Sequence, residues 1–334
     1  MREVANAHES PGTATATAPL RAWRTVISLV AGMGVAAGAA WILGVRPGEV
    51  LSRAAGTPPW AIAGCAFSGY VVLALQTLRW HQVMRPLLGL GYGEAFRAQT
   101  IGGMLNAILP ARVGDLLRAQ YLGHITGKSR ATVLGTEVVD RWLDWWGWVP
   151  VVGVLAMTSR LPAWMHVAVA VFGAALLASG VAMVLLRRRP SARIATSRFA
   201  EIAASFRAGI DSFASRRTLV LALAVAPLPW LWEAGVLAIT SRAFDVHLTF
   251  PMAFCVLVGF NAATVIPSPG GIGALETGGA AVLALFGVNH VNALAFLFVY
   301  HFTQLVPLIV GGAMLLALRP QPIFVGTRAK ERIG

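Results

Sequence analysis

The chain has 334 residues, of which 57% are hydrophobic and 12% charged, and its mean hydropathy is +0.68. This balance predicts an all-α polytopic membrane protein and leaves no room for a large soluble domain. The net charge of +13 lies mostly in segments that we assign to the cytoplasmic side, so it favours anionic lipid headgroups. We therefore expect membrane lipid as a partner, and no nucleic acid.

Most of the chain is apolar enough to lie in a bilayer. Residues 1–20 are expected to be a disordered N-terminal tail and residues 321–334 a basic C-terminal tail, which leaves a transmembrane domain over 21–320. A bilayer span needs about 20 mostly apolar residues. Six stretches meet this criterion: 23–44, 60–79, 132–157, 164–186, 219–241 and 291–318.

The transmembrane domain divides into two halves, 21–190 and 218–320, joined by residues 191–217. The linking segment spaces Ile and Phe among Arg and Ser at helical intervals, which predicts an amphipathic helix. Two interpretations stay open for it: a helix that lies on the cytoplasmic membrane surface, or a simple connection between the halves.

Two further segments are apolar but broken, and both follow the same order of residues. Each runs from an Asn through apolar residues to Pro, Gly and a carboxylate, Asn106 to Asp115 in the first and Asn261 to Glu276 in the second. Backbone that is broken at membrane depth must be buried in protein or line a polar cavity. We predict two re-entrant hairpins, at about 95–118 and 251–286. The alternative for each is one kinked span or two full spans.

Basic residues set the expected orientation, because cytoplasmic loops carry an excess of Lys and Arg. With both termini in the cytoplasm, the outside loops contain four arginines: Arg46, Arg53, Arg160 and Arg242. The two hairpins then enter from opposite sides of the inner (cytoplasmic) membrane, and their breaks approach each other near the midplane. This geometry is typical of an inverted repeat.

Ionisable side chains inside a membrane are costly, which makes them candidates for a functional site. Several lie in or after the first break and on the third span: Arg112, Asp115, Arg118, Glu137, Asp140, Arg141 and Asp144. Helical spacing predicts that Arg141 pairs with Glu137 and with Asp144 along one face. The guanidinium groups of Arg112, Arg118 and Arg141 suit bidentate binding of a phosphodiester. Glu137 and Asp144 suit equally well a role that only holds helices together.

The second break contains elements that could bind an anion. Ser268 followed by Pro269 resembles an N-cap with Pro at the first helical position, so a helix is expected to start there. Gly270 and Gly271 allow backbone amide groups to approach a ligand, although glycine also permits close helix packing. Glu276 lies within two turns of that start, where it could partner an arginine of the first hairpin.

Other features of the sequence carry less weight. Cys65 and Cys255 lie in apolar runs and are interpreted as packing residues. The clustered Trp142, Trp145, Trp146 and Trp148 are interpreted as packing or lipid-facing side chains, with an acyl-chain groove as the alternative. The histidines have no metal-ligand spacing and no nucleotide motif is present, so we expect no cofactor, metal or catalytic residue.

These motifs in this order resemble a known family. Leu78-Arg79-Trp80, the first broken motif with Arg118, the charged group of the third span, and Ile266 to Glu276 are similar to the flippase-like transmembrane region of lysylphosphatidylglycerol synthases. The resemblance covers about 20–320. The family includes the membrane half of the multiple peptide resistance factor and stand-alone relatives. Without the soluble synthase domain, we expect no lipid synthesis. A homodimer is implied by the resemblance alone.

The leading hypothesis is a lipid translocase of the cytoplasmic membrane, and not an enzyme. It moves an anionic phospholipid or a lipid-linked intermediate between leaflets. The alternatives are a non-transporting scaffold for lipid or glycolipid synthesis and, with less support, a membrane-embedded transferase that uses Asp140 or Glu276 as a base. The candidate binding residues are Arg79, Asn106, Arg112, Asp115, Arg118, Glu137, Asp140, Arg141, Asn261, Gly270, Gly271 and Glu276.

Overall fold

A computed structural model describes residues 34, 38, 45–109, 112–158, 163–188, 198–211, 215–266 and 268–318. Every regular element in these ranges is a helix, which confirms the predicted all-α membrane protein. Both expected tails, and all but two glycines of the expected first span 23–44, lie outside the described residues.

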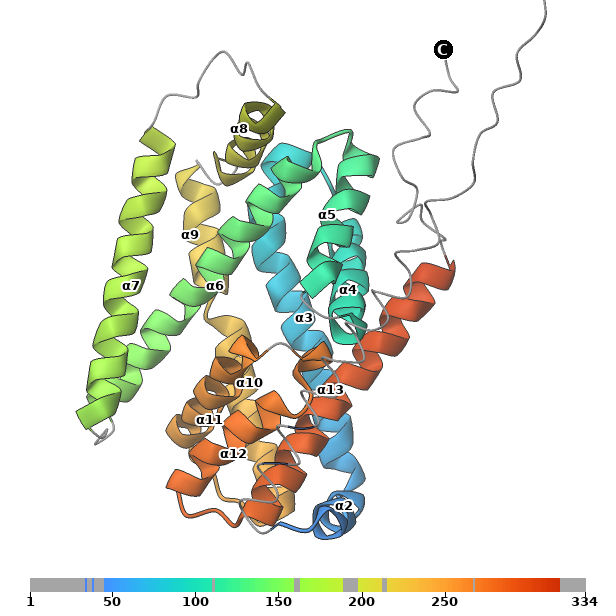
Figure 1. Cartoon of the computed structure of the whole chain (residues 1–334), viewed down its shortest axis with the longest axis vertical. Coiled ribbons are helices and arrows are strands. Elements are labelled where there is room, and N and C mark those ends of the chain that lie inside the picture. Colours follow the sequence, from blue (N-terminus) through green and yellow to red (C-terminus); the bar gives the residue numbers. More distant parts are fainter. Residues whose placement is uncertain are drawn as a thin grey trace, which may run out of the picture.

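The described helices run mostly along the long axis of the molecule (Figure 1). In chain order they are α2 (Pro47–Ala55), α3 (Pro59–Leu88), α4 (Tyr92–Ile108), α5 (Val113–Thr126), α6 (Arg130–Thr158), α7 (Ala163–Arg188), α8 (Arg198–Ile210), α9 (Arg216–Val225), α10 (Leu228–Thr240), η3 (Ser241–Phe244), α11 (Phe250–Ala262), η4 (Ala263–Val265), η5 (Pro269–Gly271), α12 (Ala274–Leu285) and α13 (His290–Leu318). The short amphipathic α2 was not predicted.

Three helices of the described part are long and apolar enough to cross a membrane: Pro59–Leu88, Arg216–Phe244 and His290–Leu318. The second of these contains α9, α10 and η3, and Pro227 lies between α9 and α10. A proline lacks the backbone N–H that continues a helix, which explains the interruption there. Helices α6 and α7 match the predicted stretches 132–157 and 164–186 in position.

Both broken segments form a helix, an irregular turn and a second helix. The arms are short, with 17 and 14 residues in α4 and α5 and 13 and 12 residues in α11 and α12. All four fall below the roughly 20 residues of a full span. Figure 1 shows the α4–α5 pair in the upper half of the molecule and the α11–α12 pair in the lower half, with both turns toward the middle.

The two turns adjoin each other in space. A methyl group built on Gly270 would lie 3.2 Å from the carbonyl oxygen of Ala107, at the end of α4, and 3.3 Å from Leu305 of α13. Gly270 has a φ of 61°, in the left-handed region that glycine adopts without strain. The sequence pattern therefore placed the breaks correctly, and the fold brings the second one against the first hairpin.

Helix α8 packs directly on α6. A side chain on Gly135 of α6 would overlap the carbonyl oxygen of Phe206, and one on Gly209 of α8 would overlap that of Thr132. Only glycine permits backbones to approach so closely. Part of the predicted 191–217 helix is thus observed over 198–210 as a packed element, while 191–197 and 212–214 lie outside the described residues.

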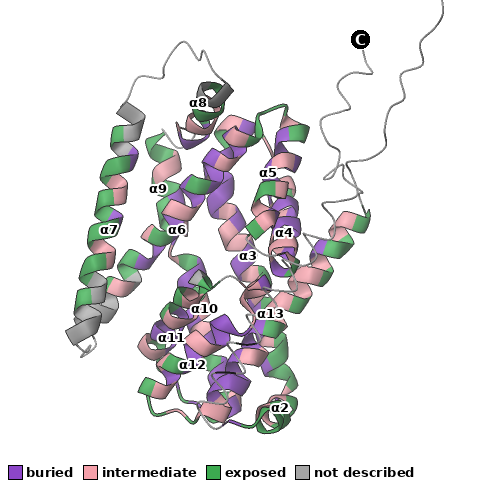
Figure 2. Ribbon diagram, viewed as in Figure 1, coloured by how far each residue is buried: buried purple, intermediate pink, exposed green. Residues whose placement is uncertain are grey.

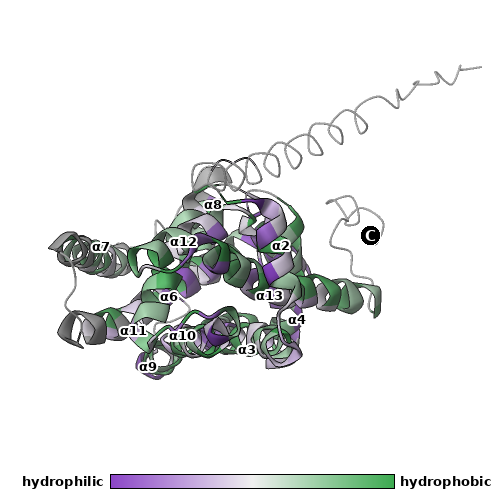
Figure 3. Cartoon of the chain, turned by 90° about the horizontal axis from the view of Figure 1, so that it is seen from below, coloured by the Kyte–Doolittle hydropathy of each residue, from purple (hydrophilic) through white to green (hydrophobic). Residues whose placement is uncertain are grey.

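Apolar side chains fill the interior and also lie on the outside; Figure 2 shows buried and exposed positions side by side along most helices. One buried cluster lies among α10 to α13 and includes Trp230, Phe254 and Phe296, with Trp148 of α6 packed against it. Cys65 and Cys255 are buried and free. Outward-facing apolar residues on α7 include Val171, Leu177 and Val181, and Figure 3 shows hydrophobic residues along most helices. A bilayer accommodates such a surface, whereas water does not.

Candidate functional site

Arg79 of α3 lies at the centre of a buried charge cluster. Arg79 is only 1% exposed. Its Nε donates to Asp140 Oδ1 at 2.8 Å, and a second nitrogen donates to Asp144. Both carboxylates lie on α6, one turn apart. The pairs therefore tie α3 to α6, and the guanidinium has little freedom to bind anything else.

Arg118 of α5 is held in a similar way. Its Nε donates to Glu137 Oε1 at 3.0 Å, another nitrogen donates to Gln99 of α4, and its guanidinium lies 4.3 Å from the ring centre of Trp80. The pairing predicted along α6 is wrong. Glu137 bonds to Arg118 and Asp144 to Arg79, because the carboxylates of α6 point at neighbouring helices.

Asp115 lies between two arginines at the first break. It accepts a hydrogen bond of 2.9 Å from Asn106 Nδ2, and its oxygens lie 3.6 Å from Arg118 and 3.7 Å from Arg141. The Arg141 side chain is 42% exposed. The distances from Asp115 to the two arginines are longer than the 2.8 Å bond between Arg79 and Asp140. The guanidinium of Arg141 can therefore take another anionic partner.

Arg112 caps the start of α5 and is exposed. Its φ of 54° places it in the left-handed region, which non-glycine residues seldom adopt. Arg112 and Arg141 are thus the arginines of the predicted set whose guanidinium groups can reach a ligand, whereas Arg79 and Arg118 are buried in ion pairs.

The second break is built around Glu276, which is completely buried. One oxygen accepts a 2.7 Å hydrogen bond from the Gly273 N–H and the other lies 2.7 Å from His301 Nδ1. The expectation of an arginine partner is wrong: the partner is a histidine of α13, because α12 faces α13 and not the first hairpin. The carboxylate of Glu276 therefore ties α12 to α13.

Two further predictions for this break need correction. Ser268 makes no capping hydrogen bond, and only the single turn η5 follows it; α12 begins at Ala274, after Gly271 and Gly273 with φ of 76° and 84°. Asn261 donates to the carbonyl oxygen of Leu257 in its own helix at 2.9 Å. Asn261 is therefore occupied locally, while Asn106 contacts the charge cluster.

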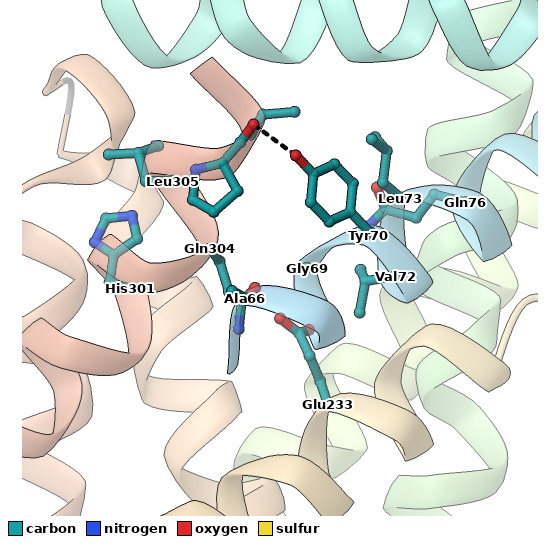
Figure 4. Close-up of a pocket in the computed structure, with 12 residues that line it drawn as sticks. Ala66, Gly69, Tyr70, Val72, Leu73, Gln76, Glu233, His301, Gln304 and Leu305 are labelled. Carbon is teal, nitrogen blue, oxygen red and sulfur yellow. Dashed lines mark hydrogen bonds between the residues drawn. The ribbon is translucent and has the colours of Figure 1, made fainter. Parts of the chain in front are cut away.

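A cavity of about 240 Å³ lies between α3, α10 and α13, close to the second break (Figure 4). Its polar lining comprises Tyr70, Gln76, Glu233, His301 and Gln304. The predicted site omitted these residues. Two sequence features could have indicated these residues. Glu233 is a lone carboxylate in an apolar stretch, and His301 and Gln304 are polar residues spaced three apart in the last span. Among the residues described, no metal-binding group of three His, Cys, Asp or Glu occurs.

Comparison with known proteins gives two matches. The model of the family described as "Lysylphosphatidylglycerol synthase TM region" matches residues 27–312. A "UPF0104 membrane protein" of Methanothermobacter thermautotrophicus is 30% identical over 115 residues, which cover 34% of this chain and 34% of that protein. The aligned part thus spans about a third of that relative's length.

Proposed function

The chain belongs to the lysylphosphatidylglycerol synthase transmembrane-region family, and from that premise we propose that it is a lipid translocase. Its cargo is an anionic phospholipid or a lipid-linked intermediate with an anionic headgroup, which it moves between the leaflets of the cytoplasmic membrane. It acts as a transporter and not as an enzyme, with both termini in the cytoplasm.

One observation carries this proposal: two exposed or half-exposed arginines, Arg112 and Arg141, lie beside the break of the first hairpin. The tip of the second hairpin packs against the same region through Gly270 and Ala107. Positive charge at membrane depth is expensive and is retained where it binds a substrate or a partner. Guanidinium groups bind phosphate oxygens in pairs, which suits a phospholipid headgroup.

Asp115 supports an exchange of partners during transport. The carboxylate of Asp115 lies 3.7 Å from Arg141 and 3.6 Å from Arg118. A phosphate entering beside Arg112 competes with Asp115 for Arg141, and Asp115 retains Arg118 and Asn106. The headgroup then crosses on these side chains while its acyl chains stay in the lipid, against the apolar outer faces of the helices.

Arg79 and Arg118 have a supporting role in this proposal. Their ion pairs to Asp140, Asp144 and Glu137 join α3, α5 and α6 into a fixed wall. A rigid wall lets the two hairpins move against it, as required when a site opens to one side of the membrane at a time. These pairs are short and buried, so ligand binding does not break them.

The test is a leaflet-accessibility assay in proteoliposomes that contain a fluorescent anionic phospholipid. Dithionite added outside bleaches the outer leaflet, and translocation exposes the inner pool. We expect the wild type to expose it, and Arg112→Gln and Arg141→Gln to slow the rate at least about tenfold, the effect of losing about 1.4 kcal/mol of binding in the transition state. Arg46→Gln is the matched control, because the Arg46 side chain is 85% exposed and pairs only loosely with Glu49.

Wild-type protein that exposes no more lipid than protein-free vesicles, with phospholipids and with polyprenyl-linked lipids alike, would contradict the proposal. The non-transporting scaffold would then be the better hypothesis. Equal rates for Arg112→Gln, Arg141→Gln and the wild type would remove these arginines from the site.

A further inference from the structure

We infer that the cavity between α3, α10 and α13 binds a small monovalent metal cation, with the Glu233 carboxylate as its charged ligand. This inference concerns ion binding alone and does not depend on lipid translocation. Glu233 projects into the cavity from α10, opposite Gln304 of α13 (Figure 4).

The carboxylate of Glu233 has no basic partner within salt-bridge distance among the residues that the structure describes. Its hydrogen bond comes from the hydroxyl of Tyr300, at 3.4 Å. The buried carboxylates named above differ. Asp140, Asp144 and Glu137 each bond to an arginine, and Glu276 pairs with His301. An ionised carboxylate at membrane depth needs a cation or a proton to offset the cost of its burial.

The cavity supplies the oxygen-rich surroundings that a hard cation prefers. Gln76 of α3 and Gln304 of α13 line it on opposite sides, and both carry a carboxamide oxygen. In the described structure the Gln304 Nε2 is buried without a hydrogen-bond partner. The two ends of a carboxamide have nearly the same shape, so a half-turn presents Oε1 in place of that nitrogen. Carboxylate, amide oxygen and water are the usual ligands of hard cations.

The backbone of α13 has a carbonyl group that lacks its helical partner beside the cavity. Pro307 lies inside α13, and its missing N–H leaves the carbonyl group of Thr303, next to Gln304, without that partner. The Tyr70 hydroxyl donates to the Pro307 carbonyl at 2.9 Å (Figure 4). This bond fixes the tyrosine at the edge of the cavity, where it is 39% exposed.

Charge and size select a monovalent ion. Among the described residues that line the cavity, Glu233 is the one acidic residue, and the lining histidine, His301, has its Nδ1 bonded to Glu276. One negative charge balances one positive charge, whereas a divalent ion would leave an excess charge in an apolar surrounding. The volume of about 240 Å³ accommodates the ion with several waters, each of which occupies about 30 Å³ in the liquid.

The experiment measures thermal unfolding of the purified full-length protein in detergent at fixed pH. Sodium, lithium or potassium chloride replaces N-methylglucamine chloride step by step, so the ionic strength stays constant. Because a ligand that binds only the folded state stabilises it, we expect a saturable rise in Tm with at least one alkali ion. Glu233→Gln should abolish the rise. Glu49→Gln, an exposed carboxylate on α2, should retain it.

Should Glu233→Gln fail to fold, Gln76→Leu and Gln304→Leu provide the second test. Each keeps the carboxylate and removes one oxygen ligand, so the half-saturating ion concentration should rise at least about tenfold. A Tm that is the same in all four salts would overturn the inference, as would an ion response that Glu233→Gln preserves. Neither readout involves lipid movement, so failure here leaves the translocase proposal to its own test.

Discussion

Glu276 and His301 are 25 residues apart and lie 2.7 Å from each other, with the carboxylate Oε1 facing the imidazole Nδ1. The second oxygen of Glu276 accepts the backbone N–H of Gly273. One buried side chain thus fixes the end of the broken segment and ties it to α13. Since His301 also lines the cavity, helix α13 contacts both the second hairpin and the cavity.

Removal of this carboxylate should destabilise the protein. Glu276→Ala leaves the Gly273 N–H and the His301 ring without a partner in the interior, which costs about 1–3 kcal/mol for each unsatisfied group. Glu276→Gln retains an acceptor oxygen and should cost less than Glu276→Ala. The Tm in detergent measures both. Equal Tm values for the two variants would show that an acceptor oxygen at this position does not contribute to stability.

The ion pairs of Arg79 should matter for stability more than those of Arg141. Arg79→Met leaves Asp140 and Asp144 buried without a counter-charge, a change that costs about 3–5 kcal/mol. Arg141→Gln gives up a 3.7 Å contact between Asp115 and an arginine side chain that is itself 42% exposed, which is worth at most about 1 kcal/mol. The fraction of protein that remains monodisperse after heating should therefore fall sharply for Arg79→Met alone. Similar losses for the two variants would contradict this division into fixed and exchangeable arginines.

Much of the fold was predictable, because proline, glycine and charge are conspicuous in apolar sequence. Pro110 and Gly114 marked the first break, and the alternation of Pro and Gly from Pro267 to Gly273 marked the second. The family assignment also rested on these motifs, and the match over 27–312 confirms it.

The pairing of charges was not predictable from spacing. Positions three and four apart on a helix can pair, but Glu137 and Asp144 turn toward Arg118 and Arg79 on neighbouring helices. Which helices adjoin is decided by packing, and the sequence of α6 does not contain that information. The same holds for His301, whose role depends on α12 lying against α13.

Close packing inside the first hairpin gives a prediction with a matched control. A side chain on Gly114 of α5 would overlap the carbonyl oxygen of Gly102 in α4, whereas one on Gly93 of α4 would meet nothing within 4 Å. Gly114→Ala should therefore push the arms apart, lower the Tm and slow lipid movement. Gly93→Ala should leave the Tm unchanged or raise it slightly, because alanine favours helix by about 1 kcal/mol. A normal Tm for Gly114→Ala would mean that the arms are not in contact.

Arg112 allows the loss of charge to be separated from the loss of structure. Its φ of 54° is strained for arginine and free of strain for glycine. In Arg112→Gly the relief, about 1 kcal/mol, is roughly offset by the greater freedom that glycine has in the unfolded chain. We therefore expect an unchanged Tm and a large loss of lipid exposure to dithionite.

The control for Arg112→Gly is Asp245→Gly, because Asp245 is the other non-glycine residue of the described chain with positive φ, 56°. It is exposed, follows η3 and pairs with Arg53 of α2, a residue of neither hairpin. That variant should retain transport, and a comparable loss in both would trace the effect to the backbone and not to the guanidinium.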